Sequence, residues 1–320
     1  MTGSKAGKKE KGRFEEITAL LVSVGFTAII FLAAILLSDE LAQYVAKGLS
    51  ISARVIIPSI FPFLILSDLA VRYIHLERVG FLRRIFERTF RINGAALPVF
   101  VCGALCGFPI GAKLAIVMYD DGKISKCECE RLIAFSNNAS PGYVICAVGV
   151  GMLGNLHDGI LLYAAMILSS IFTGIIIGAN KHNSSNSIFI YEQNYSFAES
   201  VKSATGVCLH VAGFVTVFSI VTGAVDFLID SEVVKSLVIP FLEIGNATVD
   251  LSDLYIYPRY ITLTLIAFSI SFSGLCVSAQ VMSLIGKESD ISMRRYVPRK
   301  ILQGCIAAII ILLISIIKGP

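Results

Sequence analysis

Charged residues are scarce in this sequence. They make up 16% of its 320 residues, whereas 55% are hydrophobic and the mean hydropathy is +0.78. A soluble protein of this length carries a charged share of about 25%, so the scarcity of charge excludes an ordinary soluble globular protein. A Walker-type glycine loop and a dinucleotide-binding fingerprint are also absent, which excludes the common nucleotide-binding sites of enzymes and pumps.

The histidines and cysteines form no recognisable site. The four histidines are scattered, and none stands near a serine, cysteine or acid at a spacing that predicts a nucleophilic catalyst. Six of the eight cysteines lie in apolar segments, where cysteine behaves as a small hydrophobic residue. Cys127 and Cys129 are a close pair in a polar loop, without a second pair or a nearby histidine. We therefore expect no enzyme activity, no metal site, no cofactor and no disulfide framework.

Hydrophobic stretches of membrane-spanning length recur along the chain. A bilayer core requires about 20 apolar residues per helix. The stretches are 19–37, 51–71, 95–118, 132–153, 160–179, 207–229, 261–285 and 301–317. The sequence therefore predicts an all-α polytopic membrane protein, with a polar tail at 1–16 and a leading transmembrane helix at 17–37.

Basic residues gather at the predicted membrane edges. One cluster at residues 5–13 precedes the first span, and another at residues 72–91 follows the second span. Two spans separate the clusters, so they lie on one side of the membrane, which the positive-inside rule assigns to the cytoplasm. The net charge of +4 therefore predicts contact with a lipid bilayer and no nucleic-acid partner.

Two stretches inside hydrophobic segments contain residues that interrupt a helix. The first is Gly-Phe-Pro-Ile-Gly-Ala-Lys at 107–113, and the second is Gly-Leu-Cys-Val-Ser-Ala-Gln at 274–280. A comparison without gaps aligns the two stretches. Paired interruptions in two halves of a chain predict the binding site of a transporter. We therefore interpret residues 50–179 and 204–317 as two repeats, joined by a polar linker at 180–203.

The orientation of the second repeat is open. Inverted repeats with re-entrant hairpins place the polar tip at 287–300 opposite the first tip, whereas the five basic residues of this tip favour the cytoplasm. We favour inverted repeats with re-entrant or broken helices. Non-helical backbone at membrane depth is tolerated only where it is buried in protein or lines a water-filled cavity.

Lys113 is the charged candidate in the first interrupted segment. An ionisable group in a membrane segment costs roughly 2.5–3.5 kcal/mol, so it usually faces a cavity or a partner. The interruption at Gly107, Pro109 and Gly111 places helix ends beside it, and their positive potential suits an anion. The alternative is a lysine that extends to the membrane interface.

The gapless alignment of the two interrupted stretches pairs Gln280 with Lys113. Ser273, Gly274 and Ser278 surround Gln280. A neutral amide opposite a lysine suits a substrate with both charge and hydrogen-bonding groups. The alternative for the serines is helix packing, because small residues let helix backbones approach closely in membranes.

Two further groups of polar residues adjoin apolar runs. Asn137, Asn138 and Ser140 stand beside a proline and a glycine. They predict either a broken helix whose carbonyls bind a cation or a polar substrate, or an interfacial loop. Glu243 and Asn246 share a predicted helix face. They predict either a carboxylate that binds a proton or a coupling cation, or an acid outside the membrane.

Several segments together resemble one known family. They are 58–63, 107–113, 130–132, 135–141, 242–244 and 273–280. In order and spacing they resemble the YlbJ-type sporulation integral membrane proteins of the nucleoside-recognition (Gate) superfamily. The resemblance covers most of residues 50–310. It implies two Gate-type repeats and a multi-pass location in the cell membrane or forespore membrane of a spore-forming bacterium.

The resemblance also implies a cargo. Proteins of this type are associated with moving dipicolinate (pyridine-2,6-dicarboxylate), a small aromatic dianion, into the forespore. We therefore expect a secondary or passive transporter or channel for a small anionic solute, with homo-oligomers or other sporulation membrane proteins as further partners. Two alternatives stay open: a nucleoside or nucleobase transporter, in which Lys113 is dispensable, and a non-transporting scaffold of sporulation.

Overall fold

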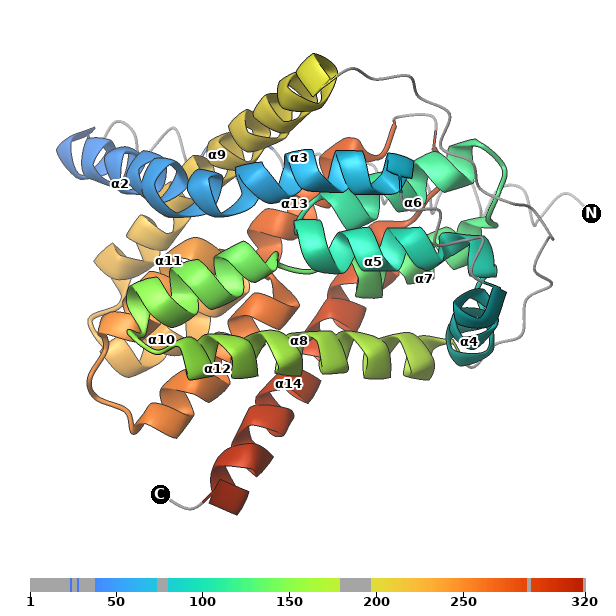
Figure 1. Cartoon of the computed structure of the whole chain (residues 1–320). Helices are drawn as coiled ribbons and strands as arrows, with labels where there is room; N and C mark the ends of the chain where they lie inside the picture. The colour runs from blue at the N-terminus through green and yellow to red at the C-terminus, as the bar shows by residue number, and fades with distance from the viewer. Residues whose placement is uncertain are drawn as a thin grey trace, which may run out of the picture.

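A computed structural model describes residues 24, 28, 38–73, 80–178, 197–286 and 289–318. Within these ranges every regular element is a helix and no strand occurs (Figure 1). Apart from residues 24 and 28, the predicted tail and leading span lie outside the described residues. Most of the predicted linker at 180–203 lies outside them too.

The helices are mostly short, and two of them are π-helices (η1 and η4). In chain order they are α2 (Ser38–Ile51), η1 (Ser52–Ile56), α3 (Ile57–Tyr73), α4 (Gly80–Phe90), η3 (Gly94–Ala96), α5 (Leu97–Cys106), α6 (Ile110–Asp120), α7 (Lys126–Ser136), η4 (Gly142–Met152), α8 (Leu156–Ile177), α9 (Phe197–Leu228), α10 (Glu232–Leu242), α11 (Ile244–Asp253), α12 (Arg259–Phe272), α13 (Gly274–Leu284), η5 (Met293–Arg295) and α14 (Tyr296–Lys318).

Five helical stretches of the described chain are long and apolar enough to cross a membrane. They are Asp39–Leu66, Leu156–Ile177, Phe197–Leu228, Arg259–Leu284 and Met293–Ile317. A sixth candidate is the pair Gly80–Phe90 and Gly94–Cys106, which is bent by 105°. The prediction of an all-α polytopic membrane protein is therefore confirmed.

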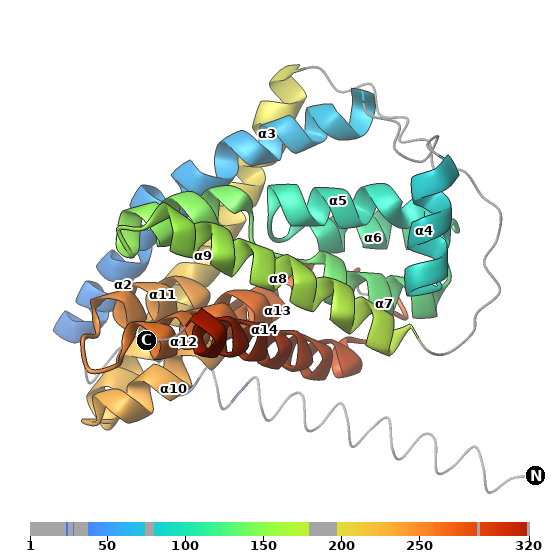
Figure 2. The same ribbon diagram turned by 60° about the horizontal axis from the view of Figure 1, so that its bottom comes forward.

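Helix α4 lies across one end of the bundle, nearly perpendicular to α5 and α8 (Figure 2). Phe86 and Phe90 anchor it in the core, with ring centroids 4.8 Å apart, whereas Phe81 and Ile85 are exposed. The backbone N–H of Asn93, just after α4, donates to a Glu128 oxygen in α7 at 2.9 Å. The turn between α6 and α7 therefore lies at the same end, which we call the α4 end.

The same series of elements occurs twice along the chain: a hairpin, then a broken helix, then a long helix. In the first series α5 and α6 fold back at 107–109, α7 and η4 form a helix broken at 137–140, and α8 follows. In the second series α10 and α11 fold back at Glu243, α12 and α13 form a helix broken at Ser273, and α14 follows. The boundaries of the two predicted repeats stay a prediction, but each series lies largely within one of them.

The two hairpins enter the bundle from opposite ends. The first opens at the α4 end, as described above. The second opens where α12 begins, because Ser236 of α10 lies 2.9 Å from the Tyr257 hydroxyl. Arg259, in the first turn of α12, binds Asp158 in the first turn of α8 at 2.6 Å. Helix α8 then runs the length of the bundle to Gly178, which packs against the backbone at the end of α4.

The second polar tip lies beside the first and not opposite it. Lys126 Nζ lies 3.2 Å from an Asp290 oxygen, and the Ser292 N–H donates to Glu130 at 2.9 Å. The expectation that inverted repeats place the tip at 287–300 at the opposite end is therefore wrong. The reason is that α12 and α13 continue through the bundle as one 26-residue span instead of folding back.

Candidate functional site

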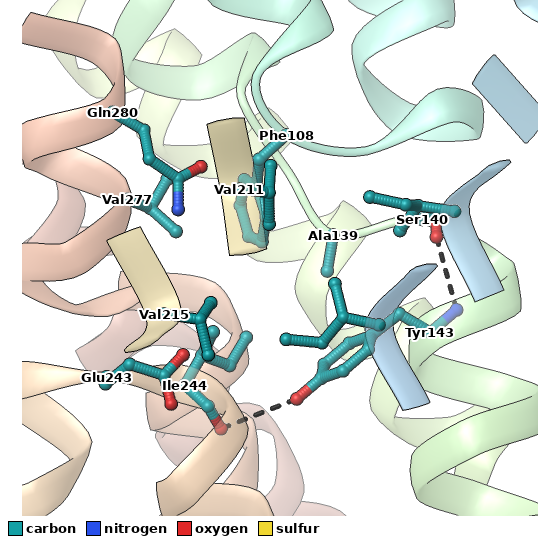
Figure 3. A pocket seen from close by; sticks show the side chains of 12 residues that line it. Phe108, Ala139, Ser140, Tyr143, Val211, Val215, Glu243, Ile244, Val277 and Gln280 are labelled. Carbon is teal, nitrogen blue, oxygen red and sulfur yellow. Dashed lines mark hydrogen bonds between the residues drawn. The ribbon is translucent and has the colours of Figure 1, made fainter. Parts of the chain in front are cut away.

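The interruptions of both series meet at one cavity between the two halves (Figure 3). Phe108 comes from the first hairpin tip, Ser140 from the first broken helix, Glu243 from the second tip and Gln280 from the second broken helix. The complete lining is Ile56, Ile60, Phe108, Ala139, Ser140, Tyr143, Val211, Val215, Glu243, Ile244, Val277 and Gln280. This lining contains one carboxylate and no lysine, arginine or histidine.

The cavity is small in this conformation. Its free volume is about 30 Å³, which is room for two or three water molecules at roughly 10–15 Å³ each. A planar ring with two carboxylates does not fit between these side chains. A ligand of that size enters only if the surrounding helices move apart, so the structure is a closed arrangement of the site.

Each hairpin tip packs against the broken helix of its own series. A Cβ atom added to Gly107 would lie 2.9 Å from the Ser140 nitrogen. In the second series, a Cβ atom added to Gly274 would lie 2.9 Å from the Leu242 carbonyl oxygen and 3.2 Å from the Glu243 nitrogen. Gly107 in the first tip therefore corresponds to Leu242 and Glu243 in the second, because both positions touch the neighbouring broken helix.

The gapless alignment of the two halves is consequently wrong. It pairs Gly107, in a hairpin tip, with Gly274, in a broken helix, and likewise pairs Lys113 with Gln280. Both segments carry helix-interrupting residues, but the chain reverses at the first and continues at the second. Gly107 and Gly274 do share a backbone conformation, with φ of +83° and +72°, which glycine adopts without a steric penalty.

Small residues of the first hairpin bring it against α7. A Cβ atom on Gly111 would lie 2.3 Å from the Ser136 carbonyl oxygen, and one on Gly103 would lie 1.8 Å from the same atom. Gly111 is therefore a packing residue of the hairpin. Pro109 is buried at the start of α6, where its missing N–H leaves no intrahelical hydrogen bond unmade.

Lys113 lies one turn into α6 and is half-buried. It is not among the residues that line the cavity. The structure therefore does not bring it together with Ser140, Glu243 and Gln280, which do line the cavity. Its role as a ligand of an anionic cargo stays a prediction.

Asn137 and Asn138 are fully buried and are held by α14. Lys300 Nζ donates to the Asn137 carbonyl oxygen at 3.0 Å and to Gln303 Oε1 at 2.8 Å. Gln303 Nε2 donates to Asn138 Oδ1 at 2.8 Å, and Asn137 Nδ2 donates to the Tyr296 hydroxyl at 3.1 Å. The predicted broken helix is present, but the side chains of both asparagines bind α14 and do not line the cavity.

Lys300 is a buried ionisable residue beside the first broken helix that sequence reasoning missed. Its side chain is 0% exposed, although it closes a basic run at 294–300 that predicts a solvated tip. The signal that identifies it is helical spacing. Tyr296, Lys300, Gln303 and Ala307 recur at intervals of four, three and four, which places them on one face of α14, and all four are buried.

Glu243 is the carboxylate of the cavity and is 0% exposed, so it is not a solvated surface acid. Its oxygens accept hydrogen bonds from the backbone N–H groups of Gly245 and Asn246, at 2.8 and 2.6 Å, and from Asn246 Nδ2 at 2.9 Å. Asn246 Nδ2 also lies 2.8 Å from the Ser219 hydroxyl of α9. The first turn of α11 therefore compensates the carboxylate, as expected for an acid at a helix N-terminus.

Gln280 presents its amide to the cavity (Figure 3). Its Nε2 lies 3.5 Å from the Cys276 sulfur, and its buried Oε1 has no hydrogen-bond partner among the described residues. Ser273 and Ser278 instead donate to carbonyls of their own helices, at 3.3 and 3.1 Å. Gln280 is thus available to a ligand, and the two serines satisfy the backbone around the interruption.

Tyr143 joins the two halves at the cavity and was not predicted from the sequence. Its hydroxyl lies 2.8 Å from Thr248 Oγ1 and donates weakly to the Ile244 carbonyl at 3.4 Å. Its backbone N–H donates to Ser140 Oγ at 3.2 Å. No local pattern separates this tyrosine from the other aromatic residues of the chain, because its partners come from a distant segment.

Comparisons with known proteins agree with this membrane architecture. No protein-family model and no solved structure matches the chain. The sporulation integral membrane protein YlbJ of Bacillus subtilis (strain 168) is 28% identical to it, over 93% of this chain and 83% of the relative. This similarity supports a YlbJ-type family assignment. Together with the apolar helices it supports a multi-pass integral membrane protein of sporulation. The relative's name states no cargo, and the Gate-type character of the repeats stays a prediction.

Proposed function

We propose that this YlbJ-type protein is a secondary transporter whose cargo passes the cavity between the two halves. The observation that supports the proposal is the convergence of two hairpin tips and two broken helices on one cavity. Transporters built from inverted repeats bind their substrates between broken helices near the middle of the membrane. Buried ionisable groups inside membrane proteins are costly and usually functional, and Glu243 is one of them.

Dipicolinate is the cargo that we propose first. The YlbJ-type resemblance and the relative's place in sporulation support it. Its aromatic ring matches the apolar and aromatic walls formed by Phe108, Tyr143 and Val277. Helix α11 begins at the cavity, but its first N–H groups already bind the Glu243 carboxylate. A dianion beside Glu243 therefore requires a compensating charge, so we expect dipicolinate to enter together with protons or a metal cation.

A neutral nucleobase or nucleoside is the second candidate. The observation that favours it is the composition of the lining, which has a carboxylate and an amide but no lysine or arginine. Glu243 accepts hydrogen bonds, and the unpaired Oε1 of Gln280 does so too. Together they suit the donor groups on the edge of a base. This cargo requires no compensating charge.

Uptake into liposomes that contain the purified protein tests both candidates. Dipicolinate and uridine are offered in parallel, and liposomes without protein give the background. We expect Gln280→Leu and Glu243→Gln to lower the uptake of the true cargo by about tenfold or more, which corresponds to the loss of one hydrogen bond of about 1.4 kcal/mol. Glu232→Gln, on an exposed position of α10, is the matched control and should transport normally.

Lys113→Gln separates the two cargoes. Loss of dipicolinate uptake with intact protein supports Lys113 as an anion ligand in an open state. Normal dipicolinate uptake removes Lys113 from the site. If folded wild-type protein takes up neither solute above background, the transport proposal fails for both.

A further inference from the structure

A fully buried lysine lies outside the cavity and is not used by the proposed transport step. Lys300 is fully buried in α14, and its Nζ donates to the Asn137 carbonyl and to Gln303 Oε1. Both acceptors are neutral. Among the residues that the structure describes, no carboxylate lies within ion-pair distance of this amine.

The surroundings of Lys300 have the chemistry of a site for a monovalent cation. Asn137 is the C-terminal cap of α7, and the last carbonyls of a helix carry a negative partial charge of about half a unit. The interruption at 137–140 leaves the Asn137 carbonyl free of helical bonding, so it is available to a cation. Gln303 adds an amide oxygen to the same site and is itself held by Asn138.

We propose that the first broken helix contains a built-in cation site and that the ammonium group of Lys300 occupies it. Lys300 is a positioning residue, because it acts through the backbone at 137–140. The next residues of that segment, Ala139 and Ser140, line the cavity. The amine neutralises the carbonyl end of α7 and fixes the conformation in which this segment faces the cavity. Only its consequence for cargo uptake rests on the proposed function.

The site predicts chemical rescue. If the side chain is shortened to alanine, the oxygen atoms at Asn137 and Gln303 remain and enclose a space of the size of the lost side chain. A small alkylammonium ion then restores both the volume and the charge. A neutral amide of the same size restores the volume alone. Rescue by the first and not by the second is a result that a purely space-filling role of Lys300 does not produce.

Thermal unfolding of the full-length protein in detergent measures the chemical rescue without any cargo. We expect Lys300→Ala to lower the Tm by about 5 °C or more, since a loss of 1 kcal/mol shifts the Tm of a large domain by about 2–4 °C. Propylammonium at about 100 mM should restore at least half of the shift, and propionamide should not. Lys113→Ala is the matched control, and its Tm should not respond to the amine.

Two outcomes overturn the proposal. One is a Tm of Lys300→Ala equal to that of the wild type. The other is rescue by propionamide as large as rescue by propylammonium. If the alanine variant is not recovered in folded form, Lys300→Arg is compared with Lys300→Gln. An arginine variant more stable than the glutamine variant supports the site, and the reverse order overturns it.

The same variants then report on transport. If wild-type protein takes up neither dipicolinate nor uridine, the melting results still decide the cation site, so the two proposals fail separately. If wild-type protein transports, we expect Lys300→Ala to lose uptake and to regain part of it with propylammonium.

Discussion

The two broken helices differ in how their interruptions are held. Three side chains of α14 bind the first one through the backbone and side chains of Asn137 and Asn138. At the second, Ser273 and Ser278 hydrogen-bond only to carbonyls of their own helices. A fully satisfied buried network rigidifies the elements that it joins, whereas a bond within one helix does not join that helix to a neighbour.

Under the proposed transport function, this difference indicates which half moves when the cavity opens. Transporters with inverted repeats alternate by rocking one set of elements against the other. The first broken helix is tied to α14, so we expect it to keep its conformation. The second hairpin and its broken helix, which touch each other closely at Gly274 and Leu242, are the part we expect to move as a unit.

The largest expected effect comes from crowding the first hairpin. In Gly103→Val, the Cβ atom alone would lie 1.8 Å from the Ser136 carbonyl oxygen, so α5 and α7 must separate. We expect a loss of about 3 kcal/mol or more and little folded protein by size-exclusion chromatography. Gly274→Ala, at 2.9 Å from Leu242, should cost less. Gly213→Ala, which meets open space, is the control. An equal loss of folded protein in Gly103→Val and Gly274→Ala would contradict the expected difference between the two halves.

The next prediction compares the hydrogen bonds that hold the first interruption with those that hold the second. Gln303→Leu removes a donor to Asn138 and an acceptor of Lys300, so we expect a loss of about 2–3 kcal/mol in the free energy of unfolding. Ser278→Ala removes one bond within a helix and should cost about 0.5 kcal/mol or less. Unfolding of both variants in the same detergent checks the order. A cost of Ser278→Ala as large as that of Gln303→Leu would reject the idea that the second interruption is less firmly held.

A smaller effect of opposite sign is expected at Ser273. This residue has φ of +75°, where an L-residue other than glycine is disfavoured by about 1 kcal/mol. Ser273→Gly should therefore raise the Tm slightly. Ser125→Gly is the matched substitution in the first half, where φ is −72° and the serine forms a capping box with Glu128, and it should lower the Tm. Destabilisation by both substitutions would show that the Ser273 side chain matters more than its backbone.

The smallest effect concerns the contact between the two polar tips at the α4 end. The hydrogen bond from the Tyr119 hydroxyl, and then Lys126, hold the pKa of the Asp290 carboxyl below its ordinary value. A depressed carboxyl pKa stabilises the fold above the ordinary pKa of about 4, and this contribution is lost as the pH falls below that value. The Tm difference between wild type and Asp290→Asn should therefore be larger at pH 7 than at pH 3. It should be small, because the group is exposed.

The positions of three interruptions were predictable because they are encoded locally. Glycine, proline, asparagine and serine disfavour a helix wherever they cluster, and the groups at 107–113, 135–142 and 271–280 all mark a true interruption. The reversal at Glu243 was not predicted, because Glu243 and Asn246 were expected on one helix face, whereas Glu243 separates α10 from α11. Whether the chain reverses or continues after an interruption depends on packing against distant helices. For that reason the alignment of the two halves and the position of the second polar tip were wrong.

The candidate site was predictable in part. Ser140, Glu243 and Gln280 were predicted and line the cavity. Lys113 was chosen because it follows a visible interruption, and it lies away from the cavity. Lys300 was overlooked because the arginines before it dominate the local charge pattern, and only the spacing of its neighbours along α14 reveals that it faces inward. Contacts between distant segments, such as that of Tyr143 with α11, have no local signature at all.

Helix α4 has a consequence for the depth of the cavity between the two halves. The first hairpin starts directly after α4, and if this helix lies in the plane of the bilayer surface, as surface-bound amphipathic helices do, the hairpin descends from that surface. Helix α5 has 10 residues and α10 has 11. At 1.5 Å per residue each is about 15–17 Å long, which is half of a hydrocarbon core of about 30 Å. In that orientation each descending arm crosses half of the hydrocarbon core, and the two tips meet near its middle. Lengthening either arm by one turn would carry its tip about 5 Å past the other, so the length of each hairpin sets how the two tips face each other across the cavity.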